Sequence, residues 1–161
     1  GYDYKNNNTD TFMNAVIDAA LAMQSLIIGA ESMELGSCPI SYLRNEIVAL
    51  SELLKLPEGV FPICGLTIGY KDAEGKISMR LPQEIVVHTN QYDDSGLESE
   101  IAKYDARESE RNPISPDKQR HTDKYGILKK CTWSENVVRQ LSISERDDFF
   151  EYLKSKNINL V

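Results

Sequence analysis

Residues 56–70 read LPEGVFPICGLTIGY, a run rich in apolar and β-branched side chains. From residue 60 to residue 70 it has the length and composition of a strand that is buried on both faces. Gly65 and Gly69 interrupt this run, and glycine in a strand often marks a bend or the close approach of another segment. We therefore expect a buried strand over residues 60–70 in the core sheet.

The most apolar part of the chain lies upstream, at residues 12–35, where charged residues are sparse. A helix that is apolar almost all round is buried all round, so the pattern predicts a long central helix, or one that is shared with a partner subunit. Thr9 or Asp10 is the expected cap at its start. Gly36 stands just past its expected end, a position that favours glycine.

The rest of the chain has patterns of shorter elements. They are a short buried strand or loop over 37–43, a helix from Asn45, its cap, to Leu54, a turn over 71–76, an extended segment over 84–89, helices over 97–111, 133–141 and 146–156, and a loop over 112–130. Helices around a few non-adjacent strands indicate an α+β fold. We expect one domain, in which residues 1–92 hold the central helix and the sheet and residues 93–161 form a helical arm.

The charge of the chain limits its partners. Its 161 residues carry 18 basic and 25 acidic side chains, a net charge of −7, which argues against nucleic-acid binding. Residues 111–130 depart from this balance, with six basic side chains against two acidic ones. The six are Arg111, Lys118, Arg120, Lys124, Lys129 and Lys130. This basic loop either binds an anionic ligand or is a solvated charged loop.

The cysteines and the apolar stretches indicate the compartment. Three cysteines and two histidines, widely spaced, make no zinc pattern, so no metal is expected. Unpaired cysteines of this kind are typical of the reducing cytosol. The apolar stretch at 15–30 is interrupted by Asp18 and Gln24 and is shorter than the ~20 residues that span a bilayer. We expect a cytoplasmic protein with no membrane segment.

Four blocks of sequence, in order, resemble one known family. Residues 17–44 read IDAALAMQSLIIGAESMELGSCPISYLR, residues 56–70 supply the second block, residues 79–93 read MRLPQEIVVHTNQYD, and residues 132–158 read TWSENVVRQLSISERDDFFEYLKSKNI. They resemble the nitroreductase family in its flavin-reductase-like branch, with its Gly-Leu-x-x-Gly strand, its Arg-Leu-Pro triplet and its closing Trp-Ser and Tyr-Leu helices. The blocks cover nearly the whole chain, so together they are more specific than any single motif.

The resemblance implies a nitroreductase-like fold, with an antiparallel sheet core flanked by helices. It also implies a homodimer with FMN sites between the subunits, whose expected interface is the helix at 12–35 together with the C-terminal helices. Family members begin with a segment that holds a phosphate-gripping arginine motif and a further strand, and no part of this sequence matches it. We therefore expect the chain to be the C-terminal portion of a family member, without its N-terminal segment.

The resemblance assigns residues to the phosphate end of an FMN site. Arg80 matches an arginine that contacts the FMN phosphate, a task that suits the planar fork of donors of a guanidinium. Ser78 stands where the family usually has a lysine, so one positive charge is lost although a hydroxyl donor remains. Lys76 is a partial replacement for that charge. The alternative is a surface arginine that caps a loop.

A second segment is expected beside the flavin ring. Ile40, Ser41 and Tyr42 align with an Ile-Gly-Gly run whose backbone N–H groups reach the ring edge, where glycine permits close approach. Ser41 and Tyr42 add two side chains, and Tyr42 is expected to narrow the substrate pocket. Pro39 stands where the branch often has a tyrosine. The alternative is that this segment is only a core strand.

Three arginines are candidates for binding the nicotinamide dinucleotide. Arg111 and Arg120 are the nearest equivalents of the arginines that recognise the 2′-phosphate of NADPH from a flexible arm. Arg146 aligns with an arginine of the final helix that family members also use, so NADPH is favoured over NADH. Trp133 is expected to be a packing anchor and His88 to be structural.

FMN carries the chemistry of such enzymes, so no catalytic acid, base or nucleophile is expected. The resemblance implies an enzyme with a ping-pong cycle. NAD(P)H passes hydride to flavin N5 and leaves, and a small-molecule acceptor such as a nitroaromatic, a quinone or free flavin is reduced in the same pocket. Two alternatives remain open, a non-catalytic partial domain of the family and a protein that binds or supplies flavin.

Overall fold

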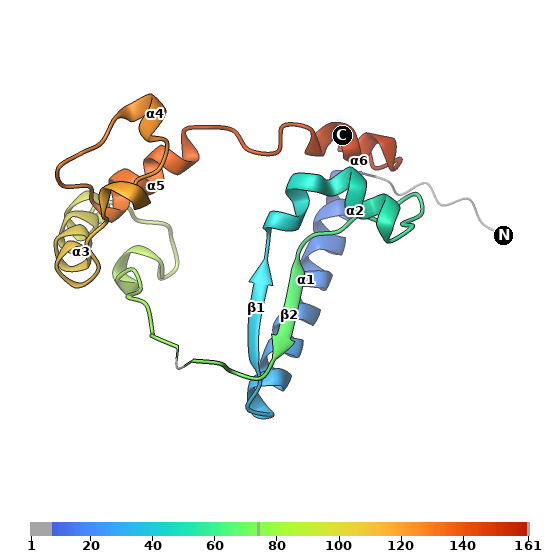
Figure 1. Cartoon of the computed structure of the whole chain (residues 1–161), viewed down its shortest axis with the longest axis horizontal. Helices are drawn as coiled ribbons and strands as arrows, with labels where there is room; N and C mark the ends of the chain where they lie inside the picture. The colour runs from blue at the N-terminus through green and yellow to red at the C-terminus, as the bar shows by residue number, and fades with distance from the viewer. Residues whose placement is uncertain (1–7, 74, 161) are drawn as a thin grey trace. The chain divides into compact units, whose positions relative to one another are not determined.

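The computed structural model describes residues 8–73 and 75–160. The described residues form two compact units, the first from residues 8–73 and 146–160 and the second from residues 75–145 (Figure 1). The expected division at residue 92 remains a prediction. In the first unit the buried side chains are mostly apolar, whereas in the second several of them are polar or charged.

α1 (Thr9–Ser32) begins the first unit. The side-chain Oδ1 of Asn8 accepts a hydrogen bond from the backbone N–H of Thr11 at 3.0 Å, so Asn8 is the N-cap. The predicted caps, Thr9 and Asp10, are wrong, because both residues already belong to the first turn. An asparagine just before that turn satisfies one of the N–H groups that the helix leaves free.

The expectation that this helix is buried all round does not hold for the single chain. Among its residues only Ala30 is buried, whereas Leu21, Leu26 and Ile28 are more than half exposed. The helix has 24 residues, more than the apolar stretch at 15–30. By length and composition it could cross a membrane, but the core helix of a soluble protein meets the same criterion. Monomeric soluble proteins rarely expose this much contiguous apolar surface.

β1 (Gly36–Ile40) and β2 (Gly65–Gly69) form an antiparallel pair, in which Ile40 lies opposite Gly65. The pair runs alongside α1 in Figure 1. A Cβ atom at residue 65 would lie 2.8 Å from Cδ2 of Leu43, so a larger residue here would make the end of that leucine side chain shift. The predicted antiparallel sheet is confirmed for these two strands.

Both strands are shorter and more exposed than predicted. Residues 60–64 are not in a strand, and Pro62 among them has no N–H group to donate to a ladder. The strand predicted over 37–43 ends at Ile40. β2 is half-buried only in its first two residues and exposed in the rest.

The core of the first unit joins residues far apart in the sequence. It lies between α2 (Ile47–Leu53), which follows directly after η1 (Tyr42–Glu46), and α6 (Phe149–Ser155). Its buried members are Ile47, Tyr152, Leu153 and Ile158, against which Phe12, Phe61, Phe149 and Leu160 pack. Two predicted boundaries are wrong: Asn45 does not cap α2, which begins one residue after Glu46, and the last helix begins at Phe149 rather than at Arg146.

α3 (Leu97–Arg111) and α5 (Trp133–Leu141) pack together in the second unit. Both helices have the predicted bounds. The rings of Tyr104 and Trp133 meet edge to face with centroids 5.0 Å apart, which confirms Trp133 as a packing anchor.

Three short helices complete the described part of the second unit: η2 (Gln83–Ile85), η3 (Pro116–Lys118) and α4 (Thr122–Tyr125). The extended segment predicted over 84–89 is wrong, because η2 and a turn occupy residues 84–86 and no strand follows over residues 87–89. The loop predicted over 112–130 contains η3 and α4. Each of these helices is about one turn long: Pro116 is the first residue of η3, and Gly126, with a positive φ, follows α4.

Candidate functional site

Arg80 and Ser78 lie together in the second unit. Nη1 of Arg80 donates a hydrogen bond to Oγ of Ser78, and both residues are exposed. They line a cavity of about 500 Å³. Its other lining residues are Met79, Leu81, Val86, Tyr104, Glu108 and Trp133. The structure therefore brings the two predicted phosphate contacts to one cavity wall.

Tyr104 and Glu108, one turn apart on α3, line the same cavity. The hydroxyl of Tyr104 donates a hydrogen bond to the carbonyl oxygen of Met79 at 3.3 Å, which ties the segment that carries Arg80 to α3. Burial raises the pKa of Tyr104, and the Glu108 carboxylate raises it further, so this hydroxyl keeps its proton at neutral pH. Oε2 of Glu108 is buried, and no described residue donates a hydrogen bond to it.

The segment expected beside the flavin ring lies in the first unit, where β1 ends and η1 begins. Ile40 is half-buried, Pro39 and Ser41 are exposed, and Tyr42 is 73% exposed, a degree of exposure unlike that of a core strand. Within the described residues, the backbone N–H groups of Ser41 and Tyr42 meet no backbone acceptor. Such groups are available to a ligand.

Arg146 belongs to the same unit as this segment. Its Nε donates a hydrogen bond to Oδ1 of Asn45, at 2.8 Å, and Asn45 belongs to η1. Arg146 has a φ of +62°, outside any helix, because the chain turns there before α6. The structure thus places Arg146 at the helical turn that begins with Tyr42, a neighbourhood that the sequence did not predict.

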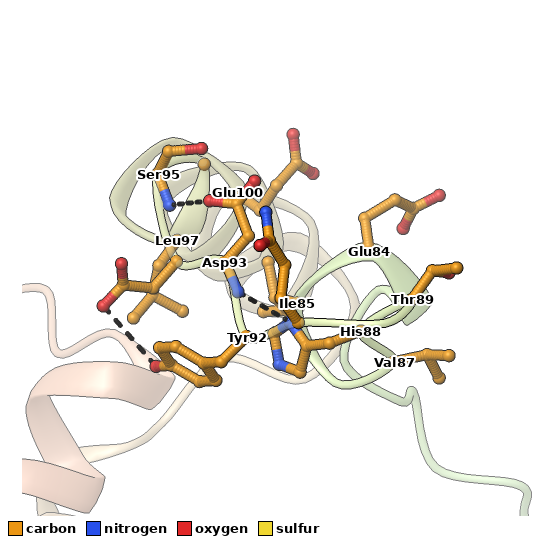
Figure 2. Close-up of a pocket in the computed structure, with 13 residues that line it drawn as sticks. Glu84, Ile85, Val87, His88, Thr89, Tyr92, Asp93, Ser95, Leu97 and Glu100 are labelled. Atoms are coloured by element: carbon orange, nitrogen blue, oxygen red, sulfur yellow. Dashed lines mark hydrogen bonds between the residues drawn. The ribbon is translucent and has the colours of Figure 1, made fainter.

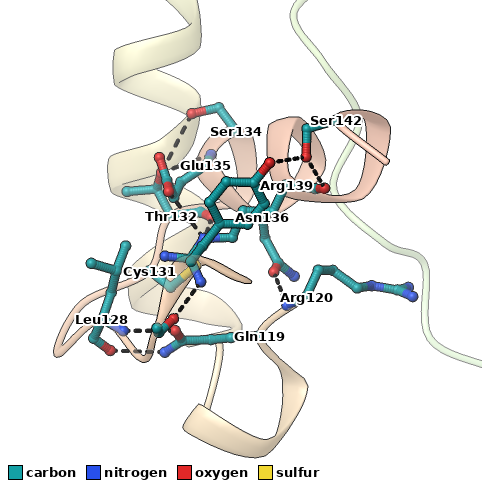
Figure 3. A network of polar contacts seen from close by, with 12 residues as sticks. Gln119, Arg120, Leu128, Cys131, Thr132, Ser134, Glu135, Asn136, Arg139 and Ser142 are labelled. Carbon is teal, nitrogen blue, oxygen red and sulfur yellow. Dashed lines mark hydrogen bonds and ion pairs between the residues drawn. The ribbon is translucent and has the colours of Figure 1, made fainter. Parts of the chain in front are cut away.

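Arg111 and Arg120 lie in the second unit. Arg111 is the last residue of α3, and Arg120 follows η3; both are exposed. The backbone N–H of Arg120 donates a hydrogen bond to Oδ1 of Asn136 at 2.7 Å, while its side chain extends away from that contact (Figure 3). The candidate residues are therefore divided between the units: residues 39–42 and Arg146 are in the first, and the other four are in the second.

A second cavity of the second unit, of about 470 Å³, was not foreseen (Figure 2). The rings of His88 and Tyr92 lie 4.7 Å apart on its wall, and Nδ1 of His88 accepts a hydrogen bond from the N–H of Asp93 at 3.4 Å. The acidic lining residues are Glu84, Asp93, Asp94 and Glu100. These carboxylates disfavour a phosphate, and the described residues contain no cluster that would hold a metal ion. His88 has structural contacts, as predicted.

Tyr104 and Glu108 were missed because they lie more than twenty residues after Arg80. The only signal was their spacing of four on a helix, which places both side chains on one face. Nothing in that spacing says that this face meets the segment at residues 78–81, because the contact is tertiary.

Comparison with known proteins gives two family matches. Residues 78–161 match the model described as "Nitroreductase family, C-terminal domain", and residues 1–70 match "Nitroreductase family". The chain is 32% identical to an FMN reductase (NADPH) of Bacillus subtilis, over 94% of this chain and 58% of that protein. It is 35% identical to an oxygen-insensitive NADPH nitroreductase of Salmonella typhimurium, over 86% of this chain and 53% of that protein.

Solved structures give the same result for the fold. The NADPH:FMN oxidoreductase of Vibrio harveyi, complexed with NAD⁺, has a TM-score of 0.79 and 30% identity, and the match covers 96% of this chain and 59% of that one. A structure of NfrA2 from Bacillus megaterium has a TM-score of 0.83 and 25% identity, with 100% and 61% covered. The chain spans between half and two thirds of the length of these proteins.

Proposed function

The chain belongs to the nitroreductase family, and from this premise we propose that the protein is an FMN-dependent oxidoreductase that passes hydride from NAD(P)H to a small-molecule acceptor. The relatives that support this proposal are named FMN reductase, NADPH nitroreductase and NADPH-flavin oxidoreductase. The observation that carries it in this chain is the shared cavity wall of Arg80 and Ser78.

The donors along that wall fit the phosphate of FMN. A guanidinium and a hydroxyl that already lie in hydrogen-bonding contact can both donate to one phosphate. The Glu108 carboxylate on the same wall offsets part of the positive charge, so the directed donors of Arg80, rather than net charge, would hold the ligand. Tyr104 holds the loop in place through Met79.

In the first unit, we propose that the N–H groups of Ser41 and Tyr42 contact the edge of a flavin ring. Bound FMN supplies the hydride exchange, and the protein supplies position and polarity. Two backbone donors without an acceptor suit the polar edge of the flavin ring. The exposed side chain of Tyr42 would then limit the shape of the acceptor, which we take to be a nitroaromatic, a quinone or free flavin.

For the dinucleotide we propose Arg111, Arg120 and Arg146, with NADPH preferred over NADH. Arg120 is exposed and its backbone is fixed, and Arg146 lies beside η1, which begins at Tyr42. We further propose a cytoplasmic homodimer in which α1 contributes to the interface. The uncovered apolar side chains of α1 support that role.

The proposal is tested by the visible spectrum of the purified full-length protein with added FMN. A flavin spectrum that stays with the protein through gel filtration is expected. Arg80→Ala should raise the Kd for FMN by about tenfold to a hundredfold, because a hydrogen bond to a charged group contributes ~1.5–3 kcal/mol. Arg107→Ala, which removes an exposed arginine of α3 outside the cavity lining, is the matched control. A protein that stays colourless after FMN is added would contradict the proposal.

The acceptor is identified by steady-state rates. Free FMN and a nitrofuran are compared as acceptors at saturating NADPH, with NADH as the second donor. Turnover with a nitrofuran supports a nitroreductase, whereas turnover with free FMN alone supports flavin supply to a partner.

A further inference from the structure

The basic loop of the second unit is held in place at its centre. Gln119 lies between Lys118 and Arg120 and is only 7% exposed. Its side-chain Nε2 donates a hydrogen bond to the carbonyl oxygen of Leu128, and its Oε1 accepts one from the N–H of the same residue, both at 2.8 Å. One amide thus pairs with both backbone groups of Leu128, as a strand partner would, and joins the two sides of the loop (Figure 3).

A second amide holds the residues on either side of Gln119. Oδ1 of Asn136 accepts a hydrogen bond from the backbone N–H of Arg120 at 2.7 Å. Nδ2 of Asn136 donates one to the carbonyl oxygen of Lys118 at 3.3 Å. The backbone is therefore fixed at two consecutive peptide groups, while the side chains of Lys118 and Arg120 are exposed.

Asn136 is itself held firmly, because α5 is anchored to its surroundings. Arg139, which is 3% exposed, donates a hydrogen bond from Nη1 to the carbonyl oxygen of Gly126 at 2.8 Å. At the start of the helix, Oδ1 of Asp105 accepts a hydrogen bond from the backbone N–H of Ser134 at 2.9 Å. The first contact joins α5 to the end of α4, and the second joins it to α3.

We propose that Asn136 and Gln119 form an amide clamp, a pair of positioning residues that fix Arg120 and Lys118 for the 2′-phosphate of NADPH. The clamp rests on the proposed function, because it gives a rigid base to a cation assigned there to the dinucleotide. A loop that is ordered before the ligand binds loses less conformational entropy on binding. A directed guanidinium then selects a phosphate at one place rather than any anion nearby.

The clamp predicts a specific kinetic change in the flavin-loaded full-length protein. Asn136→Ala removes both hydrogen bonds to the loop and should raise the KM for NADPH about tenfold, since two neutral hydrogen bonds are lost. The KM for NADH and kcat should change less than about twofold, because NADH lacks the 2′-phosphate. Gln140→Ala is the control, since it removes an amide of the same helix that has no hydrogen-bond partner among the described residues.

A mutant cycle separates positioning from general stability. Because the clamp acts through both cations, the triple variant Asn136→Ala, Lys118→Ala, Arg120→Ala should be about as impaired toward NADPH as Lys118→Ala, Arg120→Ala. A further rise in the KM for NADPH when Asn136→Ala is added to those two substitutions, or equal effects of Asn136→Ala on both nucleotides, would overturn the proposal.

Two measurements that need no turnover distinguish failure of the clamp from failure of the enzyme. Amide hydrogen exchange at Arg120 should be faster in Asn136→Ala than in Gln140→Ala; equal protection would overturn the clamp itself. Adenosine 2′,5′-bisphosphate, measured by calorimetry, should bind more weakly to Asn136→Ala, while 5′-AMP should be unaffected. A protein with the expected exchange that binds no bisphosphate would overturn the assignment of the clamp to the 2′-phosphate, whatever its flavin spectrum.

Discussion

The three cysteine side chains have different surroundings, and their reactivity should differ accordingly. Cys38 is exposed on β1, Cys64 is half-buried with its Sγ 3.2 Å from Sδ of Met23, and Cys131 is 4% exposed. Burial raises the pKa of the Cys131 thiol, so its thiolate fraction at a given pH is lower than that of an exposed cysteine. At pH 8, iodoacetamide should modify Cys38 first and Cys131 on the order of a hundredfold more slowly. Peptide mass spectrometry measures the order, and denaturant should abolish it; equal rates in the folded protein would contradict it.

Arg139 is a buried charge with specific partners, so its removal should be costly. Besides its bond to Gly126, its Nε lies 3.0 Å from Oε1 of Glu135. Arg139→Met keeps an apolar stem but leaves the Gly126 carbonyl without its donor, and we expect a loss of ~2 kcal/mol in the free energy of unfolding. Lys154→Met, which breaks the exposed pair with Glu151, should cost under ~0.5 kcal/mol. Urea titration measures both losses. Equal losses for the two variants would show that removing the buried Arg139 costs no more than removing an exposed lysine.

Residues could be assigned from the sequence where the contact is local. Ser78 and Arg80 are two positions apart and do meet. Asn45 was expected to cap a helix, yet it accepts a hydrogen bond from Arg146, which is 101 residues away. Asn136 and Gln119 carried no signal in the sequence, because each bonds backbone groups of a segment that only the fold brings close.

At the level of elements, helix boundaries were predicted well where a proline or a capping residue marks them. α3 ends before Asn112-Pro113, and α5 follows Thr132, whose side chain is a cap; both helices have the predicted bounds. β2 is shorter than predicted because the apolar run that begins at residue 60 contains Pro62, which has no N–H group to donate to a strand ladder. Apolar composition alone does not tell a strand from an irregular segment of the core.

The cap of α5 is open to a direct test. Oγ1 of Thr132 accepts a hydrogen bond from the N–H of Glu135 at 3.3 Å. A helix of nine residues has little stability of its own, so its cap matters. Thr132→Ala should lower the free energy of unfolding by about 1 kcal/mol, and Thr132→Ser should restore most of it, as measured by thermal and urea denaturation. Equal destabilisation by both substitutions would point to lost packing of the threonine methyl group instead.

At the scale of the whole molecule, the exposed apolar surface of α1 requires an explanation. The sequence predicted a helix that is buried all round, either in the centre of the fold or against a partner subunit, and the single chain leaves its apolar side chains uncovered. Leu21 is 63% exposed, and no described part of the chain shields it or its neighbours Leu26 and Ile28. A charge at Asp18 and a polar Gln24 lie among them, which suits an interface between protein subunits better than contact with lipid.

We therefore expect the full-length protein to form a dimer through α1, and Leu21→Lys to weaken it. In a symmetric dimer the substitution acts twice, and each buried leucine contributes ~1.5–3 kcal/mol, so the dimer Kd should rise by at least about a hundredfold. Leu53→Lys, at a leucine that is 77% exposed at the end of α2, is the matched control and should leave the dimer intact. Sedimentation velocity over a concentration series measures both Kd values. If Leu21→Lys leaves the dimer unchanged, or if the protein is recovered only from the membrane fraction, α1 is not the subunit interface.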